Sequence, residues 1–392
     1  MTRDFHITGA DVLWHGAITD KALSVAGGLL TEAPAGVRID LPGTLILPGI
    51  VDPHGDGFER HLAPRRGALP DLGDALAMVG AELAANGITT AMLAQFYSWE
   101  GGMRGPAFAA RMLAAHAAQV ADQPVDMRVQ LRLETHLLDD FAAFDALAAQ
   151  YDVGYVVFND HIPHAALDKG KRPPRLTGQA LKSGRSPEAH LAFLKSLHAR
   201  KSEVPAALDG LIAALSGRGV LLGSHDDATA RDREVWRARG VGISEFPETT
   251  DAAESAEKAG EAIVLGGPNV VRGGSHAGKV SAEGLIARGL CRALASDYHY
   301  PAPRQAAWKL AATMGLPAAW ALVSEGPAGM LGLADRGRLA AGLRADFIVV
   351  DPANGRPLAT FAAGRPAWLG PRVAQALLAG WGRPGALSPS AR

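Results

Sequence analysis

The sequence predicts an α/β protein built around a (β/α)₈ TIM-like barrel, with a small β-sandwich domain made from both termini. Eight short apolar runs alternate with Ala-rich helical stretches along the centre of the chain. Continuous apolar strands that alternate with helices are typical of a parallel sheet covered on both faces. Both ends of the chain instead contain short strand-like runs broken by Gly and Pro. An open doubly wound sheet is the alternative, but no Gly-rich dinucleotide motif follows the first strand.

The predicted barrel strands are residues 45–51, 88–94, 127–133, 154–158, 220–223, 242–246, 262–265 and 293–296. The helices expected between them include residues 72–85, 108–120, 141–150, 206–215 and 252–259. The small composite domain is assigned to residues 1–46 and 338–392, and the barrel to residues 47–337. A basic segment at about 163–204 interrupts the alternation. It is interpreted either as a lid on the active face of the barrel or as a solvated or disordered excursion.

Composition excludes several classes of function. The chain has 392 residues with a formal net charge of -1, which argues against a nucleic-acid or membrane-surface partner. Its single cysteine, Cys291, allows no internal disulfide and fits a reducing compartment. The N-terminus has no apolar signal core, and charged residues, Gly and Pro interrupt every apolar stretch. We therefore expect a soluble cytoplasmic protein.

Polar residues follow five of the predicted strands, which are otherwise apolar. These strand ends contain His54 and Asp56, Glu134 and His136, Asp160 and His161, His225 to Asp227, and Asp297 and His299. In a barrel such positions meet at one rim, where active sites are found. Mixed histidine and carboxylate ligands suit zinc or manganese. A lone histidine at a strand end is more often a hydrogen-bonded structural residue, but recurrence at five ends favours a metal site.

Several motifs carry a family resemblance. Residues 47–54 and 337–346 resemble the entry to the first barrel strand and the return to the small domain in the amidohydrolase superfamily. More narrowly, the chain resembles a divergent member of the PhnM diphosphatases of the carbon–phosphorus lyase pathway. The matching segments are His54-Gly55-Asp56 with Pro64-Arg65, and residues 86–90, 224–229, 245–247, 268–276 and 296–298. The chain departs from that group at residues 95–99, after His161, where it reads Ile162-Pro163-His164, and at the extra His299.

The resemblance implies a divalent metal centre with one or two ions per subunit, zinc being the expected metal and manganese the alternative. Its implied ligands are His54, Asp56, Glu134, His161, His225 and Asp297. A metal ion lowers the pKa of bound water and supplies hydroxide near neutral pH, and Asp297 is the predicted general base. The predicted phosphate contacts are Arg65, Arg272, His276 and Lys279. The alternative for Arg65 and Lys279 is that both are solvated surface charges.

The activity that the resemblance implies is hydrolysis of a ribose 1-alkylphosphonate 5-triphosphate to the 5-phosphate and pyrophosphate. The expected partners are therefore a small phosphorylated substrate and, from superfamily habit, a second subunit in a homodimer. One alternative is an amidohydrolase or deaminase that cleaves a C–N bond in a cyclic or acyl amide, which needs a carbonyl-binding pocket rather than a basic one. The other alternative is a non-catalytic barrel that binds no metal.

Overall fold

The structure is a computed structural model that describes residues 3–63, 71–274 and 279–381. The chain divides into two compact units. The first unit consists of Met1–Met92, Val120–Met127 and Val264–Arg392, and the second of Leu93–Gln119 and Arg128–Ile263.

Eight strands form one sheet in the order β15-β14-β13-β12-β11-β10-β9-β8. They are β8 (Ile50–Gly55), β9 (Ile88–Tyr97), β10 (Asp126–Glu134), β11 (Tyr155–Asn159), β12 (Leu221–His225), β13 (Ile243–Glu245), β14 (Ala262–Gly266) and β15 (Ala293–Ala295). Pairing is parallel from β10 through β13 and between β14 and β15. A parallel bridge between Gly55 and Asp297 joins the carboxyl ends of β8 and β15. The predicted (β/α)₈ barrel is confirmed, and all eight predicted strand segments contain a strand.

The first predicted strand is the exception, because it is two strands. Residues 45–48 form β7 (Leu45–Pro48), which pairs with terminal strands rather than with the barrel. The change happens at Gly49, whose N–H donates to the Asp346 carbonyl, while the N–H of Ile50 donates to the Gly87 carbonyl. A Cβ at Gly49 would lie 2.3 Å from the hydroxyl oxygen of Thr89. Only glycine permits so close an approach.

The helices between the strands follow the predicted apolar periodicity. Those predicted from the sequence are α2 (Leu72–Ala85), α3 (Pro106–Gln119), α4 (Phe141–Gln150), α8 (Val204–Gly217) and α10 (Thr250–Lys258). The remaining ones are α1 (Glu59–Leu62), α9 (Ala230–Arg237), α11 (Gly267–Arg272), α12 (Ala282–Ala287), α13 (Ala302–Met314), α14 (Leu316–Ala321) and α15 (Glu325–Met330), with 3₁₀ turns at Gly102–Arg104, Val120–Asp122 and Leu138–Asp140. Asp71 begins α2 by accepting hydrogen bonds from the N–H groups of Gly73 and Asp74, as an N-cap residue does.

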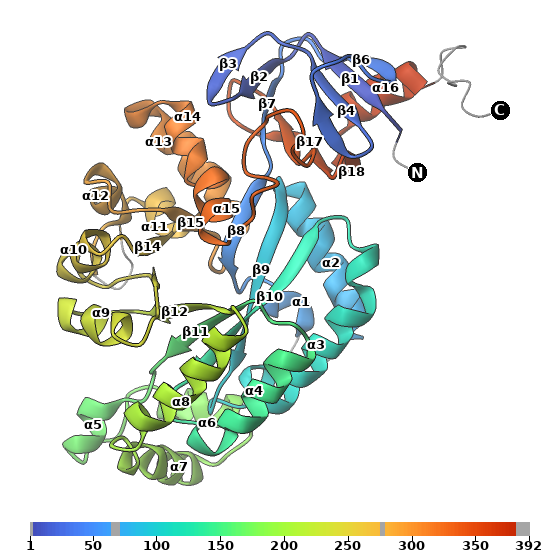
Figure 1. The fold of residues 1–392 in the computed structure, drawn as a ribbon. Helices are drawn as coiled ribbons and strands as arrows, with labels where there is room; N and C mark the ends of the chain where they lie inside the picture. Colours follow the sequence, from blue (N-terminus) through green and yellow to red (C-terminus); the bar gives the residue numbers. More distant parts are fainter. Residues whose placement is uncertain (1–2, 64–70, 275–278, 382–392) are drawn as a thin grey trace. The chain divides into compact units, whose positions relative to one another are not determined.

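The two termini form a β-sandwich within the first unit, as predicted (Figure 1). One sheet contains β1 (Phe5–Thr8), β4 (Leu23–Ala26), β5 (Leu29–Thr31) and β6 (Val37–Asp40), and the other contains β2 (Asp11–Trp14), β3 (Ala17–Thr19), β7, β16 (Phe347–Val350), β17 (Pro357–Ala362) and β18 (Arg365–Leu369). Helix α16 (Pro371–Trp381) follows β18. Phe5, Phe347 and Phe361 are buried in the core of the sandwich. The rings of Phe347 and Phe361 are stacked, with their centroids 4.5 Å apart.

The basic insertion is folded, so its interpretation as a disordered excursion is wrong. It forms α5 (His164–Asp168), α6 (Leu176–Lys182) and α7 (Pro187–Ala199), which lie together in Figure 1. Leu176, Ala180 and Leu194 are buried, because the apolar positions of these helices face a core while their basic residues face solvent. The other interpretation, that the segment is a lid, stays a prediction. Among the described residues, no helix combines the length and apolar character needed to cross a bilayer.

Candidate metal centre at the strand ends

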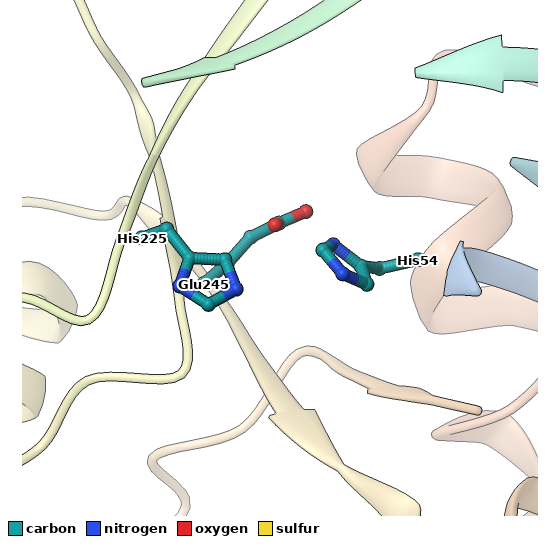
Figure 2. A group of neighbouring side chains, drawn as sticks. All are labelled: His54, His225 and Glu245. Carbon is teal, nitrogen blue, oxygen red and sulfur yellow. The ribbon is translucent and has the colours of Figure 1, made fainter. Parts of the chain in front are cut away.

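Two neighbouring strands of the second unit end in a histidine and a carboxylate. His225 is the last residue of β12 and Glu245 the last residue of β13, and they are paired in register. Figure 2 draws both side chains, together with His54 of the first unit. The Glu245 carboxylate is fully buried and accepts hydrogen bonds from the Gln130 amide at 2.8 Å and the Tyr155 hydroxyl at 2.7 Å. These two donors fix the carboxylate beside His225.

Glu134 ends β10 and is fully buried. Its carboxylate accepts a hydrogen bond from the Trp99 indole at 2.9 Å and from the backbone N–H of His161 at 3.1 Å, and it also contacts the His161 ring. Burial works against ionisation of Glu134, but the charge of His161 together with its side-chain and backbone hydrogen bonds lowers the Glu134 pKa. Burial likewise opposes the charged form of His161, yet Glu134 and Asp226 raise the His161 pKa to about 10. Glu134 and His161 therefore each favour the charged form of the other.

His225 has a charged side chain close to each ring nitrogen. Its Nδ1 lies 3.0 Å from an Asp226 oxygen, and its Nε2 lies 2.9 Å from an Arg132 guanidinium nitrogen. Because arginine only donates, Nε2 is the acceptor and Nδ1 holds the proton. One ligand atom from each of His161, His225 and Asp226 lies within 4.8 Å of the others. These imidazole and carboxylate donors fit a divalent cation, provided that His225 exchanges one of its two contacts for the ion.

The strand ends of the first unit are held through the backbone. The N–H of Asp297 donates to the His54 carbonyl at 3.0 Å, and the N–H of Asp56 donates to the Asp297 carbonyl at 2.9 Å. His54 is buried, and Asp56 and Asp297 are half-buried. The fold thus brings three of the predicted ligands to the paired ends of β8 and β15.

Three residues just past barrel strands have left-handed backbone. Asp226 follows β12 with φ 61°, Phe246 follows β13 with φ 54°, and Asp297 follows β15 with φ 54°. Non-glycine residues rarely adopt this region, and such residues cluster at functional sites. Two of these positions, Asp226 and Asp297, lie at the strand ends that carry the predicted ligands His225 and Asp297.

Known proteins resemble the chain in sequence and in fold. No family model matches the chain. The chain is 30% identical over 359 residues to α-D-ribose 1-methylphosphonate 5-triphosphate diphosphatase of Escherichia coli (strain K12), covering 88% of this chain and 91% of that protein. The chain belongs to this diphosphatase family.

Solved structures agree with the fold of this diphosphatase family member. An amidohydrolase from an environmental sample of the Sargasso Sea matches with a TM-score of 0.62 and 16% identity, covering 93% of each chain. Atrazine chlorohydrolase TrzN from Arthrobacter aurescens TC1, solved in complex with zinc, matches with a TM-score of 0.58 and 13% identity, covering 96% of this chain and 99% of that one. The predicted diphosphatase family is confirmed by the Escherichia coli relative, and the solved structures confirm the fold.

The predicted phosphate contacts of the diphosphatase family member are described only in part. Arg65 and His276 lie outside the described residues. Arg272 is the last residue of α11, is exposed, and donates a hydrogen bond to the Tyr298 hydroxyl. Lys279 is exposed. The roles of all four residues, and of the six predicted ligands, stay predictions.

Some residues that contact or neighbour the predicted ligands were not predicted from the sequence. Glu245 was recognisable, because it lies at the carboxyl end of the sixth predicted strand, residues 242–246, as Glu134 lies just past the third, residues 127–133. Asp226 lies in the motif of residues 224–229, but no role was assigned to it from the sequence. Arg132 and Trp99 gave no signal, because each contacts its histidine or carboxylate across a long sequence separation.

Proposed function

We propose that the protein acts in phosphonate metabolism by hydrolysing a ribose 1-alkylphosphonate 5-triphosphate to the 5-phosphate and pyrophosphate. The observation that supports this substrate class is the 30% identity to the Escherichia coli diphosphatase across 88% of the chain. An alignment of that extent includes the strand-end motifs of both units, from His54 to Asp297. In the reaction, a water oxygen forms a bond to the phosphorus nearest the ribose, and the bond from that phosphorus to the pyrophosphate oxygen breaks.

The proposed ligands are His54, Asp56 and Asp297 of the first unit and Glu134, His161 and His225 of the second. The donor set of imidazoles and carboxylates suits zinc, with manganese as the alternative and one or two ions per subunit. When bound, the ion would polarise the phosphoryl oxygen and lower the pKa of a bound water. Glu245, held by Gln130 and Tyr155, supplies further negative charge next to His225.

The chain itself supplies the base and the charge that meets the leaving group. Asp297 accepts the proton of the attacking water, since a carboxylate at the end of the last barrel strand is half-buried and held by its own backbone bonds. Arg65, Arg272, His276 and Lys279 are the proposed contacts of the triphosphate and of the departing pyrophosphate. Tyr298 orients Arg272 through its hydroxyl.

A substrate panel tests the proposal. The purified protein, supplied with zinc or manganese, is assayed with ribose 1-methylphosphonate 5-triphosphate, nucleoside triphosphates, and cyclic and acyl amides. Pyrophosphate release from the ribose triphosphate without amide turnover is the expected result. Amide turnover without pyrophosphate release would overturn it in favour of C–N hydrolysis. Light scattering on the same sample tests the proposed homodimer.

Elemental analysis separates the enzyme from a non-catalytic barrel. The proposal expects a divalent metal in the purified protein, or activity restored when metal is added to stripped protein. Metal near zero, together with no activity on any substrate after adding zinc or manganese, would favour the scaffold.

A further inference from the structure

A second group of histidines and a carboxylate lies in the second unit, apart from the proposed ligand set. His136 follows β10, Asp160 follows β11, and His164 begins α5. One ligand atom from each lies within 4.8 Å of the others. An Asp160 oxygen lies 3.4 Å from His136 Nδ1 and another lies 3.1 Å from His164 Nε2. His136 is buried, whereas 42% of the Asp160 side chain is exposed, so solvent reaches the group through Asp160.

A chain of hydrogen bonds orients His164 from behind. Its Nδ1 lies 2.7 Å from Nδ1 of His198 on α7, and His198 Nε2 lies 3.0 Å from an Asp168 oxygen. Because a carboxylate accepts, His198 holds a proton on Nε2, and the neutral ring then accepts at Nδ1. With a neutral His198, the proton between the two rings belongs to His164 Nδ1.

The remaining nitrogen of His164 needs a positive partner. A bare lone pair on Nε2 would face the Asp160 carboxylate at 3.1 Å, and two electron-rich atoms repel at that distance. Either a proton or a metal ion must lie between them. A histidine that ligates a metal through one nitrogen commonly donates the other N–H to a hydrogen-bonded partner, and the His198–Asp168 pair provides such a partner.

We propose that His136, Asp160 and His164 form a second site for a divalent transition metal of the zinc class. Two imidazoles and one carboxylate are zinc donors, and the exposed side of Asp160 leaves room for a water as fourth ligand. With bonds of about 2.0–2.2 Å, the ligand atoms must move closer together, which rotation of the exposed Asp160 side chain permits. The ion would join helix α5 of the insertion to the ends of β10 and β11, and His198 is a positioning residue for it.

Zinc stoichiometry tests the proposal on the full chain. Protein stripped with a chelator is dialysed against Zn²⁺, and the wild type, His164→Gln and the control His15→Gln are compared. His15 is an exposed histidine of the terminal sandwich. We expect His164→Gln to bind about one equivalent fewer than the wild type, and His15→Gln to match the wild type. With Co²⁺ as the probe, the visible absorption of the wild type should lose one component in His164→Gln.

A second variant covers the case in which His164→Gln does not fold. His198→Gln keeps all three ligands, so it should bind the same number of ions with an affinity weakened about 10-fold or more. Equal stoichiometry in the wild type and His164→Gln, or unchanged affinity in His198→Gln, would overturn the proposal and leave the contact between His164 and Asp160 as a hydrogen bond. The pyrophosphate assay is run on the same samples, and its failure in the wild type would concern the proposed substrate without changing the zinc count.

Discussion

The two units hold their strand ends in different ways. In the first unit, backbone hydrogen bonds connect His54, Asp56 and Asp297 directly. In the second unit, other side chains hold the functional groups: Trp99 holds Glu134, and Arg132 holds His225. Backbone hydrogen bonds do not depend on side-chain identity. A substitution at one of these three residues of the first unit should therefore change the chemistry of its side chain with little change in the position of its backbone. In the second unit, the orientation of Glu134 and His225 depends on side chains outside the proposed ligand set.

The largest expected effect is the loss of activity on substituting Asp297 of the first unit. Asp297→Asn should lower the rate of pyrophosphate release by about 10³-fold, because an amide cannot accept the proton of the attacking water. Asparagine tolerates the left-handed backbone of residue 297, φ 54°, so the backbone bonds to His54 and Asp56 should persist. An unchanged circular dichroism spectrum and melting temperature serve as the control. A rate within about threefold of the wild type would contradict the proposed general base.

In the second unit, the loss of a buried ion pair should have the largest effect on stability. Arg233 is fully buried and pairs with Asp227 at 3.2 Å and with Glu261 at 2.9 Å. Arg233→Met should reduce the free energy of unfolding by about 3–5 kcal/mol, because it leaves the buried Asp227 carboxylate without its cation, while Glu261 keeps its pair with Arg237. Arg231→Met on the same helix breaks only an exposed pair with Glu234 and should cost at most about 1 kcal/mol. Equal losses in urea unfolding would refute the distinction.

A smaller stability effect is expected in the first unit. Asp52 is fully buried and accepts hydrogen bonds from the Ser296 backbone N–H at 2.8 Å and hydroxyl at 2.6 Å. Ser296→Ala should cost about 1.5–3 kcal/mol at neutral pH, because a buried carboxylate loses a donor. Ser196→Ala, which removes an exposed hydroxyl bonded to the Phe193 carbonyl, should cost less than about 0.5 kcal/mol.

The loss caused by Ser296→Ala should also grow with pH. Burial raises the Asp52 pKa above its ordinary value of 3.8, and the Ser296 hydroxyl opposes that rise. Without the hydroxyl the folded-state pKa rises further, so the folded protein holds the proton more strongly than the unfolded chain. Stability then falls as pH rises from the unfolded pKa through the folded one. Chemical unfolding at about pH 4 and about pH 7 measures this, and a loss that shrinks toward neutral pH would contradict it.

The smallest expected effect concerns the side chains that hold the strand-end residues of the second unit. Trp99→Phe removes the indole donor from Glu134 but keeps an aromatic ring in the buried position. We expect the metal affinity or the rate of pyrophosphate release to fall about 10-fold, as is usual when a partner of a metal ligand is lost. Trp236→Phe, which alters a half-buried ring stacked on Phe158, is the matched control. If both variants behave alike, Trp99 acts through packing alone.

Much of the fold could be predicted from local pattern. The helices Leu72–Ala85 and Phe141–Gln150 have the predicted bounds, because an amphipathic stretch sets a helix over many residues and, at Asp71, an N-cap sets its start. The boundary at Gly49 could not be predicted, since Leu45–Pro48 and Ile50–Gly55 are both apolar and buried. Only the identity of the neighbouring strands distinguishes a sandwich strand from a barrel strand.

The sequence by itself determined that polar residues follow apolar strands, and hence that histidines and carboxylates gather at strand ends. Hydrophobic periodicity is a local property, so it can be read without coordinates. Tertiary structure decided which donor holds which acceptor: Gln130 is 115 residues from its partner Glu245, and Tyr155 is 90 residues from it. Such pairs form only after strands pack, because side-chain hydrogen bonds act over about 3 Å whatever the separation along the chain.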